Sequence, residues 1–205
     1  MKMITKKIIT LAICGVLFCQ GTITAAAQEQ YVAKEVIAEK IESICEEYGV
    51  GFQLVSYDDS KRYTSEEVNS VLANLENSLR NTSRVHYTYL ESGISPRVME
   101  TNKTYTSYGY ASNGVNGGAS LEISCDAKIN VGSISFMSIS NISTRQYGSA
   151  TNFVSWTQIG SSYEYLEGGR KARVEATGTL VTEMNILGVN HRETADHVIG
   201  MIIAA

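Results

Sequence analysis

The 205-residue sequence contains only one proline, one tryptophan, three histidines and four cysteines, and 19% of its residues are charged. So few cysteines exclude a small disulfide-dense scaffold, and 43% hydrophobic residues exclude a disordered chain. No run of basic residues occurs, which argues against a nucleic-acid partner. Apart from the N-terminal segment there is no long apolar run, so a protein with several membrane spans is excluded too.

The first 27 residues have the order of a secretory signal peptide. Lys2, Lys6 and Lys7 precede an apolar stretch at 8–18, and small residues at 25–27 predict cleavage before Gln28. The stretch is too short for a membrane anchor, and Phe18 before Cys19 argues against lipid attachment. We therefore expect a secreted, extracellular protein with no stable membrane insertion. Cleavage leaves 14 basic against 21 acidic residues, a net charge of −7.

Residues 28–95 form a predicted helical part. Apolar residues recur at helical spacing from Tyr31 to Tyr48, and Gly49 suits a left-handed cap. Residues 50–57 are expected to form a short strand. Thr64 and Glu67 have the spacing of a capping box at the start of a second helix.

Residues 96–205 form a predicted β-rich part, because period-two alternation replaces helical spacing there. The clearest strands are 119–131, whose odd-numbered residues are the small or apolar ones, and 170–187, where Gly178 predicts a bend between sheets. Weaker strands are expected at 103–111, 133–141, 152–158, 162–166 and 192–203. The expected fold is α+β, with two N-terminal helices packed on an antiparallel β-sandwich or partly open β-barrel, and 28–205 as a single domain.

Cysteine and histidine offer few candidates for chemistry. Cys45 and Cys125 each lie on a predicted apolar face, which is compatible with a disulfide bond or with two buried thiols. His191 and His197 would lie about 20 Å apart on a regular strand, too far to share a metal ion, so solvated polar residues are expected there. We expect no metal site and no cofactor.

No sequence motif indicates catalysis, and a non-enzyme is favoured. The chain lacks a Gly-x-Ser-x-Gly elbow, a phosphate-binding loop and a His-Glu-x-x-His helix. The alternative, a secreted hydrolase, would need His191 or His197 close to Glu175 or Glu183 in a pocket.

Tyrosine is the remaining signal, with 12 residues. Exposed tyrosine rings on a sheet stack on sugar faces or anchor a protein interface. The candidate binding residues are Tyr105, Tyr108, Tyr110, Tyr163 and Tyr165. The predicted function is therefore a non-catalytic extracellular module that binds a glycan or a protein.

The Ser- and Thr-rich segment 133–162 suggests a further alternative, the amphipathic hairpin of a β-pore-forming toxin. Its apolar residues Phe136, Met137 and Ile139 change face midway, which a bulge in an ordinary sheet explains more simply.

The layout as a whole resembles uncharacterised secreted proteins of Gram-positive bacteria. The similarity rests on the signal peptide, the acidic first helix, the sequence Tyr63-Thr64-x-x-Glu67, and Trp156-Thr-Gln158 and Gly169-Arg170 in the β region. It implies an exported bacterial protein and no particular functional residue.

Overall fold

The computed structural model describes residues 31–90, 100–114 and 117–205. The predicted signal peptide and Pro96 lie outside these residues. The helices are α1 (Lys34–Glu47) and α2 (Ser65–Asn81), and a single short turn is η1 (Glu167–Gly169). The strands are β1 (Gly51–Tyr57), β2 (Val85–Leu90), β3 (Glu100–Ser112), β4 (Gly118–Asn130), β5 (Ser135–Thr151), β6 (Phe153–Leu166), β7 (Lys171–Ile186) and β8 (Val189–Ala204). The protein is therefore mostly antiparallel β-sheet with two helices, as the sequence predicted in outline.

Local signals predicted both helices well. Gly49 follows α1 with a φ of +64°, the left-handed conformation that a glycine cap supplies. At the start of α2 the Glu67 amide donates to the Thr64 hydroxyl at 3.3 Å, and the Thr64 amide donates to the Glu67 carboxylate at 2.8 Å. The capping box is thus confirmed with both of its bonds.

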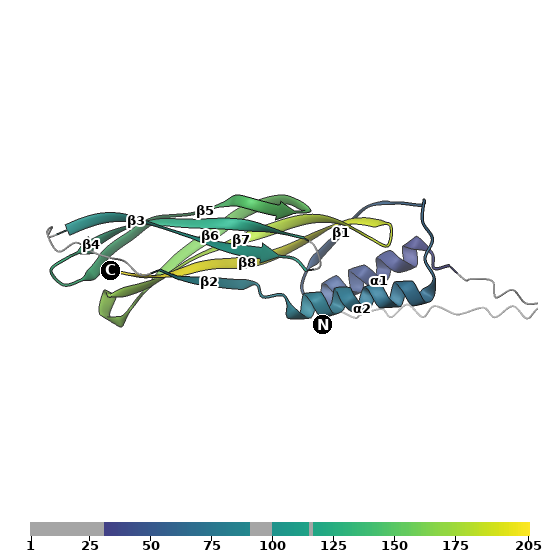
Figure 1. Ribbon diagram of the computed structural model, residues 1–205, viewed down its shortest axis with the longest axis horizontal. Coiled ribbons are helices and arrows are strands. Elements are labelled where there is room, and N and C mark those ends of the chain that lie inside the picture. Colours follow the sequence, from purple (N-terminus) through teal and green to yellow (C-terminus); the bar gives the residue numbers. More distant parts are fainter. Residues whose placement is uncertain (1–30, 91–99, 115–116) are drawn as a thin grey trace, which may run out of the picture.

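The larger sheet is organised around the long strand β8. Its strands follow the order β1-β8-β7-β6, and β2 also pairs with β8. The first half of β8 pairs antiparallel with β1, and the second half pairs in parallel with β2, from Val85 opposite Val198. The parallel pairing departs from the purely antiparallel expectation, because β2 follows α2 and returns along the molecule in the direction of β8 (Figure 1).

The smaller sheet has the order β3-β4-β5, and β4 is its centre. The predicted alternation in β4 is confirmed, since its odd-numbered residues from Ala119 to Ile129 are all buried. Tyr105 on β3 lies opposite Cys125 on β4, so the odd-numbered residues of β3 share the buried face. The even-numbered residues of both strands then form the outer face.

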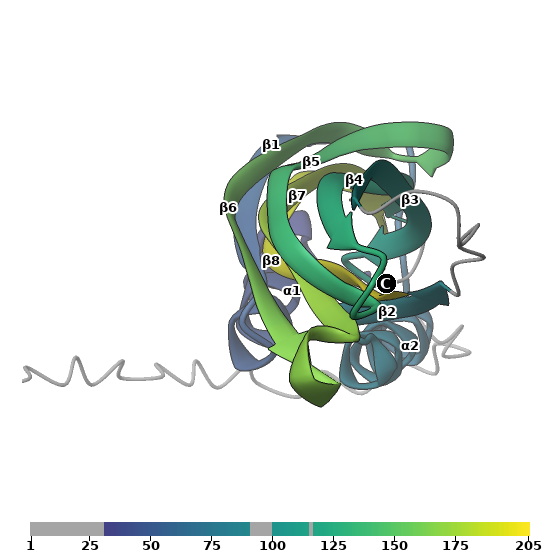
Figure 2. The same ribbon diagram turned by 90° about the vertical axis from the view of Figure 1, so that its left-hand side faces the viewer.

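The interior consists of two clusters. Side chains from both sheets form the first, and the end-on view in Figure 2 shows the strands curling around it. The second joins α1 and α2 to Leu187, Val189 and Ala195, at the start of β8. The helices accordingly lie at one end of an elongated molecule, and the β strands run along its length (Figure 1).

The prediction that Gly178 bends its strand between sheets is wrong. β7 pairs with β8 without interruption from Lys171 to Ile186, and it stays in one sheet. The irregularity lies in β6, between Gln158 and Gly160, opposite this part of β7. Gly178 serves the packing instead, because a Cβ there would lie 2.3 Å from the Trp156 ring.

Candidate functional site

Two exposed tyrosines lie on the outer face of the smaller sheet because β3 alternates. Tyr108 and Tyr110 occupy even-numbered positions and are 52% and 45% exposed. Gly118 gives Tyr110 room, since a Cβ on Gly118 would lie 2.6 Å from the Tyr110 hydroxyl. Both rings therefore present a face to solvent.

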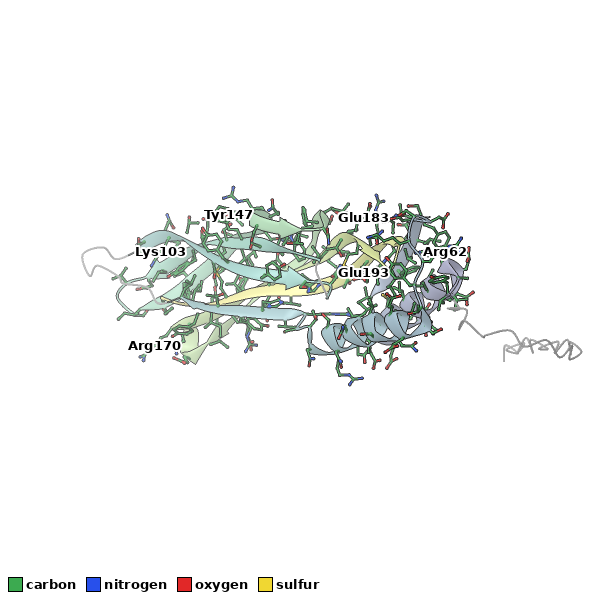
Figure 3. All side chains as sticks on the ribbon, turned by 45° about the vertical axis from the view of Figure 1, so that its right-hand side comes forward. Arg62, Lys103, Tyr147, Arg170, Glu183 and Glu193 are labelled. Carbon is green, nitrogen blue, oxygen red and sulfur yellow. The ribbon has the colours of Figure 1, made fainter. Side chains whose placement is uncertain are left out.

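A bulge in β5 brings a third tyrosine to the same place. Ala119 pairs with Ala150 and Leu121 with Gln146, so Tyr147, Gly148 and Ser149 all lie opposite Ser120. Gly148 has a φ of +77°, a conformation that glycine adopts without strain. The Tyr147 ring, which is 51% exposed, lies 5.0 Å from the Tyr108 ring, with an angle of 36° between their planes. Tyr147 is labelled at the outer surface in Figure 3.

We call Tyr108, Tyr110 and Tyr147 the tyrosine platform. They surround a shallow hollow of about 460 Å³ that is also lined by Gly109, Ser120 and Gly148. Stacking on rings and hydrogen bonding to hydroxyls are the interactions that this arrangement offers to a ligand.

An ion pair adjoins the platform on the same face. Glu122 and Arg145 continue the row that Tyr108 begins across β4 and β5. The Arg145 guanidinium donates to both Glu122 carboxylate oxygens, at 2.8 and 3.1 Å, a bidentate geometry. These hydrogen bonds raise the pKa of Arg145. The pair holds the Arg145 side chain across the sheet beside the tyrosine rings.

The five predicted tyrosines do not form one surface. Tyr105 is only 4% exposed, its ring packs edge-on against Phe136, and its hydroxyl donates to the Ala204 carbonyl. Assigning it to a binding surface was wrong, because it lies on the buried face of β3. Tyr163 and Tyr165 are exposed but lie on β6 of the other sheet, with their rings 5.3 Å apart. Tyr147, which completes the platform, was missed because its place depends on the bulge.

The histidines are buried rather than solvated, so that prediction was wrong. The inward face of β8 carries His191, Glu193 and His197, each at most 1% exposed. Both ring nitrogens of His191 face oxygens, one the Val189 carbonyl and one the Glu193 carboxylate, each at 3.1 Å. The His191 ring also stacks on Phe52, 5.0 Å between centroids.

His197 is held by an asparagine from a distant loop. Its Nε2 lies 3.0 Å from the Asn113 side-chain oxygen, and the Asn113 amide donates to the carbonyls of Leu180 and Glu193 and to the Thr182 hydroxyl. Burial lowers the pKa of His197 to about 4, so the ring is neutral at pH 7. Nε2 then carries the proton and donates to Asn113.

This buried histidine band does not match the site that a hydrolase was expected to show. Glu183 pairs with Arg192 and Glu175 lies opposite Gly200, so both glutamates occupy the outward face of the sheet. The histidines occupy the inward face, and Figure 3 shows Glu193 inside the molecule among other side chains. In the described parts of the chain no three His, Cys, Asp or Glu side chains converge in a way that would hold a metal ion.

The two cysteines among the described residues are free and lie in different clusters. Cys45 belongs to the helical cluster, where its thiol is 3.8 Å from the Glu193 carboxylate, and Cys125 belongs to the cluster between the sheets. The sequence was compatible with a disulfide bond or with two buried thiols, and the structure shows buried thiols. Burial raises the pKa of Cys125 to about 11 and also raises that of Cys45, so neither is a reactive thiolate at neutral pH.

The Ser- and Thr-rich segment forms strands β5 and β6, joined at Asn152. Lys128 pairs with Ser138 while Ile129 pairs with Phe136, so Met137 is the extra residue of a bulge. The predicted bulge in an ordinary sheet is confirmed at this position. Among the described helices, none has the length and apolarity needed to cross a bilayer.

Comparisons with known proteins add little. No family model and no curated protein matches the chain. A solved structure, that of the hypothetical protein lmo2686 from Listeria monocytogenes EGD-e, is 10% identical; the match covers 72% of this chain and 94% of that one, with a TM-score of 0.17.

Proposed function

We propose that the protein is a non-catalytic extracellular binding module whose ligand contacts the tyrosine platform. The observation that carries this proposal is the convergence of three exposed rings, from β3 and β5, on one hollow. Aromatic rings bury a large area and lose little conformational entropy on binding, because tyrosine has two rotatable side-chain bonds.

The N-terminal sequence supports the extracellular part of the proposal. The N-terminal residues have the charge, apolar stretch and small residues of a secretory signal. We also propose that residues 28–205 fold as one domain, with the two sheets as a sandwich or partly open barrel. The buried contacts of α1 and α2 with Val189 and Ala195 support this arrangement.

The test is a binding screen with the processed chain, residues 28–205, against a glycan array and extracellular protein extracts. The double variant Tyr108→Ala/Tyr147→Ala should lose binding of the ligand found. Tyr163→Ala/Tyr165→Ala is the matched control, since it removes two neighbouring exposed rings from another surface. If both variants bind as the native chain does, the platform is not the binding site.

A further inference from the structure

We propose that the outer face of the β3-β4-β5 sheet binds a linear, uncharged glycan, which runs from the tyrosine platform to a polar hollow around Asp126. The inference rests on the proposed binding function and names its ligand class. Four observations carry it: the order of side chains along the face, the balance of charge, the second hollow and the length between the two hollows.

Hydroxyl groups dominate the rows beside the platform. Thr106, Ser124 and Ser143 lie side by side across the three strands, and the two serine hydroxyls are 3.0 Å apart. In the next row the Thr104 hydroxyl and the Asn141 amide donate to Asp126, at 2.7 and 2.8 Å. Small hydroxyls and planar amide or carboxylate groups form the hydrogen bonds that sugar hydroxyls need.

Charge on the outer face is nearly balanced. It carries three acidic residues, Glu100, Glu122 and Asp126, and two basic ones, Lys128 and Arg145, while Lys103 lies at an odd-numbered position of β3, over the Tyr105 ring. Glu122 pairs with Arg145, Lys128 lies 2.7 Å from Glu100, and Asp126 accepts the two bonds given above. A charged polymer would have to break these pairs, whereas an uncharged polyhydroxyl ligand would not.

A second hollow lies further along the three strands on the same face. It measures about 450 Å³ and is lined mainly by polar side chains, including Asn102, Thr104, Asp126, Lys128, Ser138 and Ser140. Hydrogen bonds from Thr104 and Asn141 keep the pKa of Asp126 below its ordinary value. The carboxylate is therefore ionised at neutral pH and accepts hydrogen bonds strongly.

Distance along β3 sets the length of the ligand. Six residues separate Thr104 from Tyr110, which corresponds to roughly 20 Å along an extended strand. A disaccharide cannot reach both hollows, but a longer chain can stack at the platform and hydrogen-bond at Asp126. Binding should therefore strengthen with chain length.

The experiment is a calorimetric titration of residues 28–205 with glucan, mannan and β-linked N-acetylglucosamine oligosaccharides, from disaccharides to hexasaccharides. Heparin fragments and a polyglutamate peptide serve as charged probes. We expect one neutral series to bind, with at least tenfold higher affinity for the hexasaccharide than for the disaccharide. Weak or absent binding of both charged probes is expected in parallel.

Two variants assign the ends of the ligand. Tyr108→Ala/Tyr147→Ala should lose at least tenfold in affinity for every length. Asp126→Ala should weaken hexasaccharide binding about tenfold and leave the disaccharide unchanged, while Glu164→Ala, on β6, should bind like the native chain. Unfolding curves of all variants confirm that each is folded.

The outcomes separate the inference from the proposed function. Failure of every neutral series, or stronger binding of a charged probe, would overturn the glycan assignment. A protein partner found in the screen and lost in Tyr108→Ala/Tyr147→Ala would overturn the glycan assignment while the binding function stands. Oligosaccharide binding with the same affinity in Tyr108→Ala/Tyr147→Ala as in the native chain would overturn both the glycan assignment and the proposed role of the platform.

Discussion

β4 and β8 both bury every second side chain, but the two buried rows differ in chemistry. The row on β4 runs from Ala119 to Ile129 and is made of small and apolar residues. The row on β8 includes His191, Glu193 and His197 between apolar neighbours. An apolar row needs only a surface to pack on, whereas a buried polar row needs a partner for each donor and acceptor. The contacts that the β8 row makes with other elements come from β1, α1 and the loop after β3, while Glu193 Oε2 and His197 Nδ1 have no hydrogen-bond partner among the described residues.

The largest expected effect tests the apolar row. Ile123 on β4 is fully buried, so Ile123→Ala removes packed atoms and leaves a cavity. The free energy of unfolding of the variant, measured by urea denaturation, should be about 4 kcal/mol lower than that of the native chain. This loss should be the same at pH 7 and pH 5, because no ionisable group takes part. A loss that grows strongly at the lower pH would show that the two rows are coupled.

Acid should destabilise the polar row alone. The pKa of His197 is about 4 in the folded chain and about 6.5 when unfolded, so between these values the unfolded state binds more protons. The stabilising contribution is complete above pH 6.5 and is lost as pH falls towards 4, amounting to about 3 kcal/mol.

The measurement is the free energy of unfolding from pH 7 to pH 4, for the native chain and for His197→Gln. The free energy of unfolding of the variant should fall less steeply with decreasing pH, with a slope that corresponds to about one proton fewer taken up on unfolding. Arg84, His86 and Asp196, which also act on the charge of His197, are unchanged in it. Equal slopes would mean that His197 is not the group that takes up the proton.

Removing a partner from another element should have a somewhat smaller effect. Asn113→Ala removes three donated bonds and leaves His197 without an acceptor, which should cost about 2 kcal/mol. Asn185→Ala is the control, because the Asn185 side chain is exposed and makes only two bonds, to Asn190 and from the Gly188 amide, so its loss should cost less. A similar decrease in the free energy of unfolding for the two variants would indicate that the buried bonds of Asn113 contribute no more to stability than exposed ones.

The smallest expected effect belongs to a site outside both rows. Thr64→Ala removes the hydroxyl that accepts from the Glu67 amide and should cost about 1 kcal/mol, as a lost helix cap usually does. Thr64→Ser, which keeps the hydroxyl, should restore the native midpoint in urea denaturation. If Thr64→Ala lowered the free energy of unfolding as much as Ile123→Ala, the helices would contribute more to the stability than their contacts with Leu187, Val189 and Ala195 suggest.

Much of the fold was visible in the sequence because its signals are local. The helical stripe of α2, its Thr64 cap and the alternation of β4 all depend on neighbours within a few residues. Alternation also separates Tyr105 from Tyr108 and Tyr110, a signal that was present and not used. β2 was not predicted: its exposed face carries Val85, Tyr87 and Tyr89, and the partners of this strand, β8 by backbone pairing and β7 through the two tyrosines, are far away in sequence.

By itself the sequence determined where α1 ends and α2 begins, and which residues of β4 are buried, because these follow from spacing along one chain. The tertiary structure decided the rest. The bulge that carries Tyr147 to Tyr108, the burial of His191 and His197, and the separation of Cys45 from Cys125 all depend on which distant strands and helices come together. Such contacts are set by packing across the whole molecule, and no local pattern encodes them.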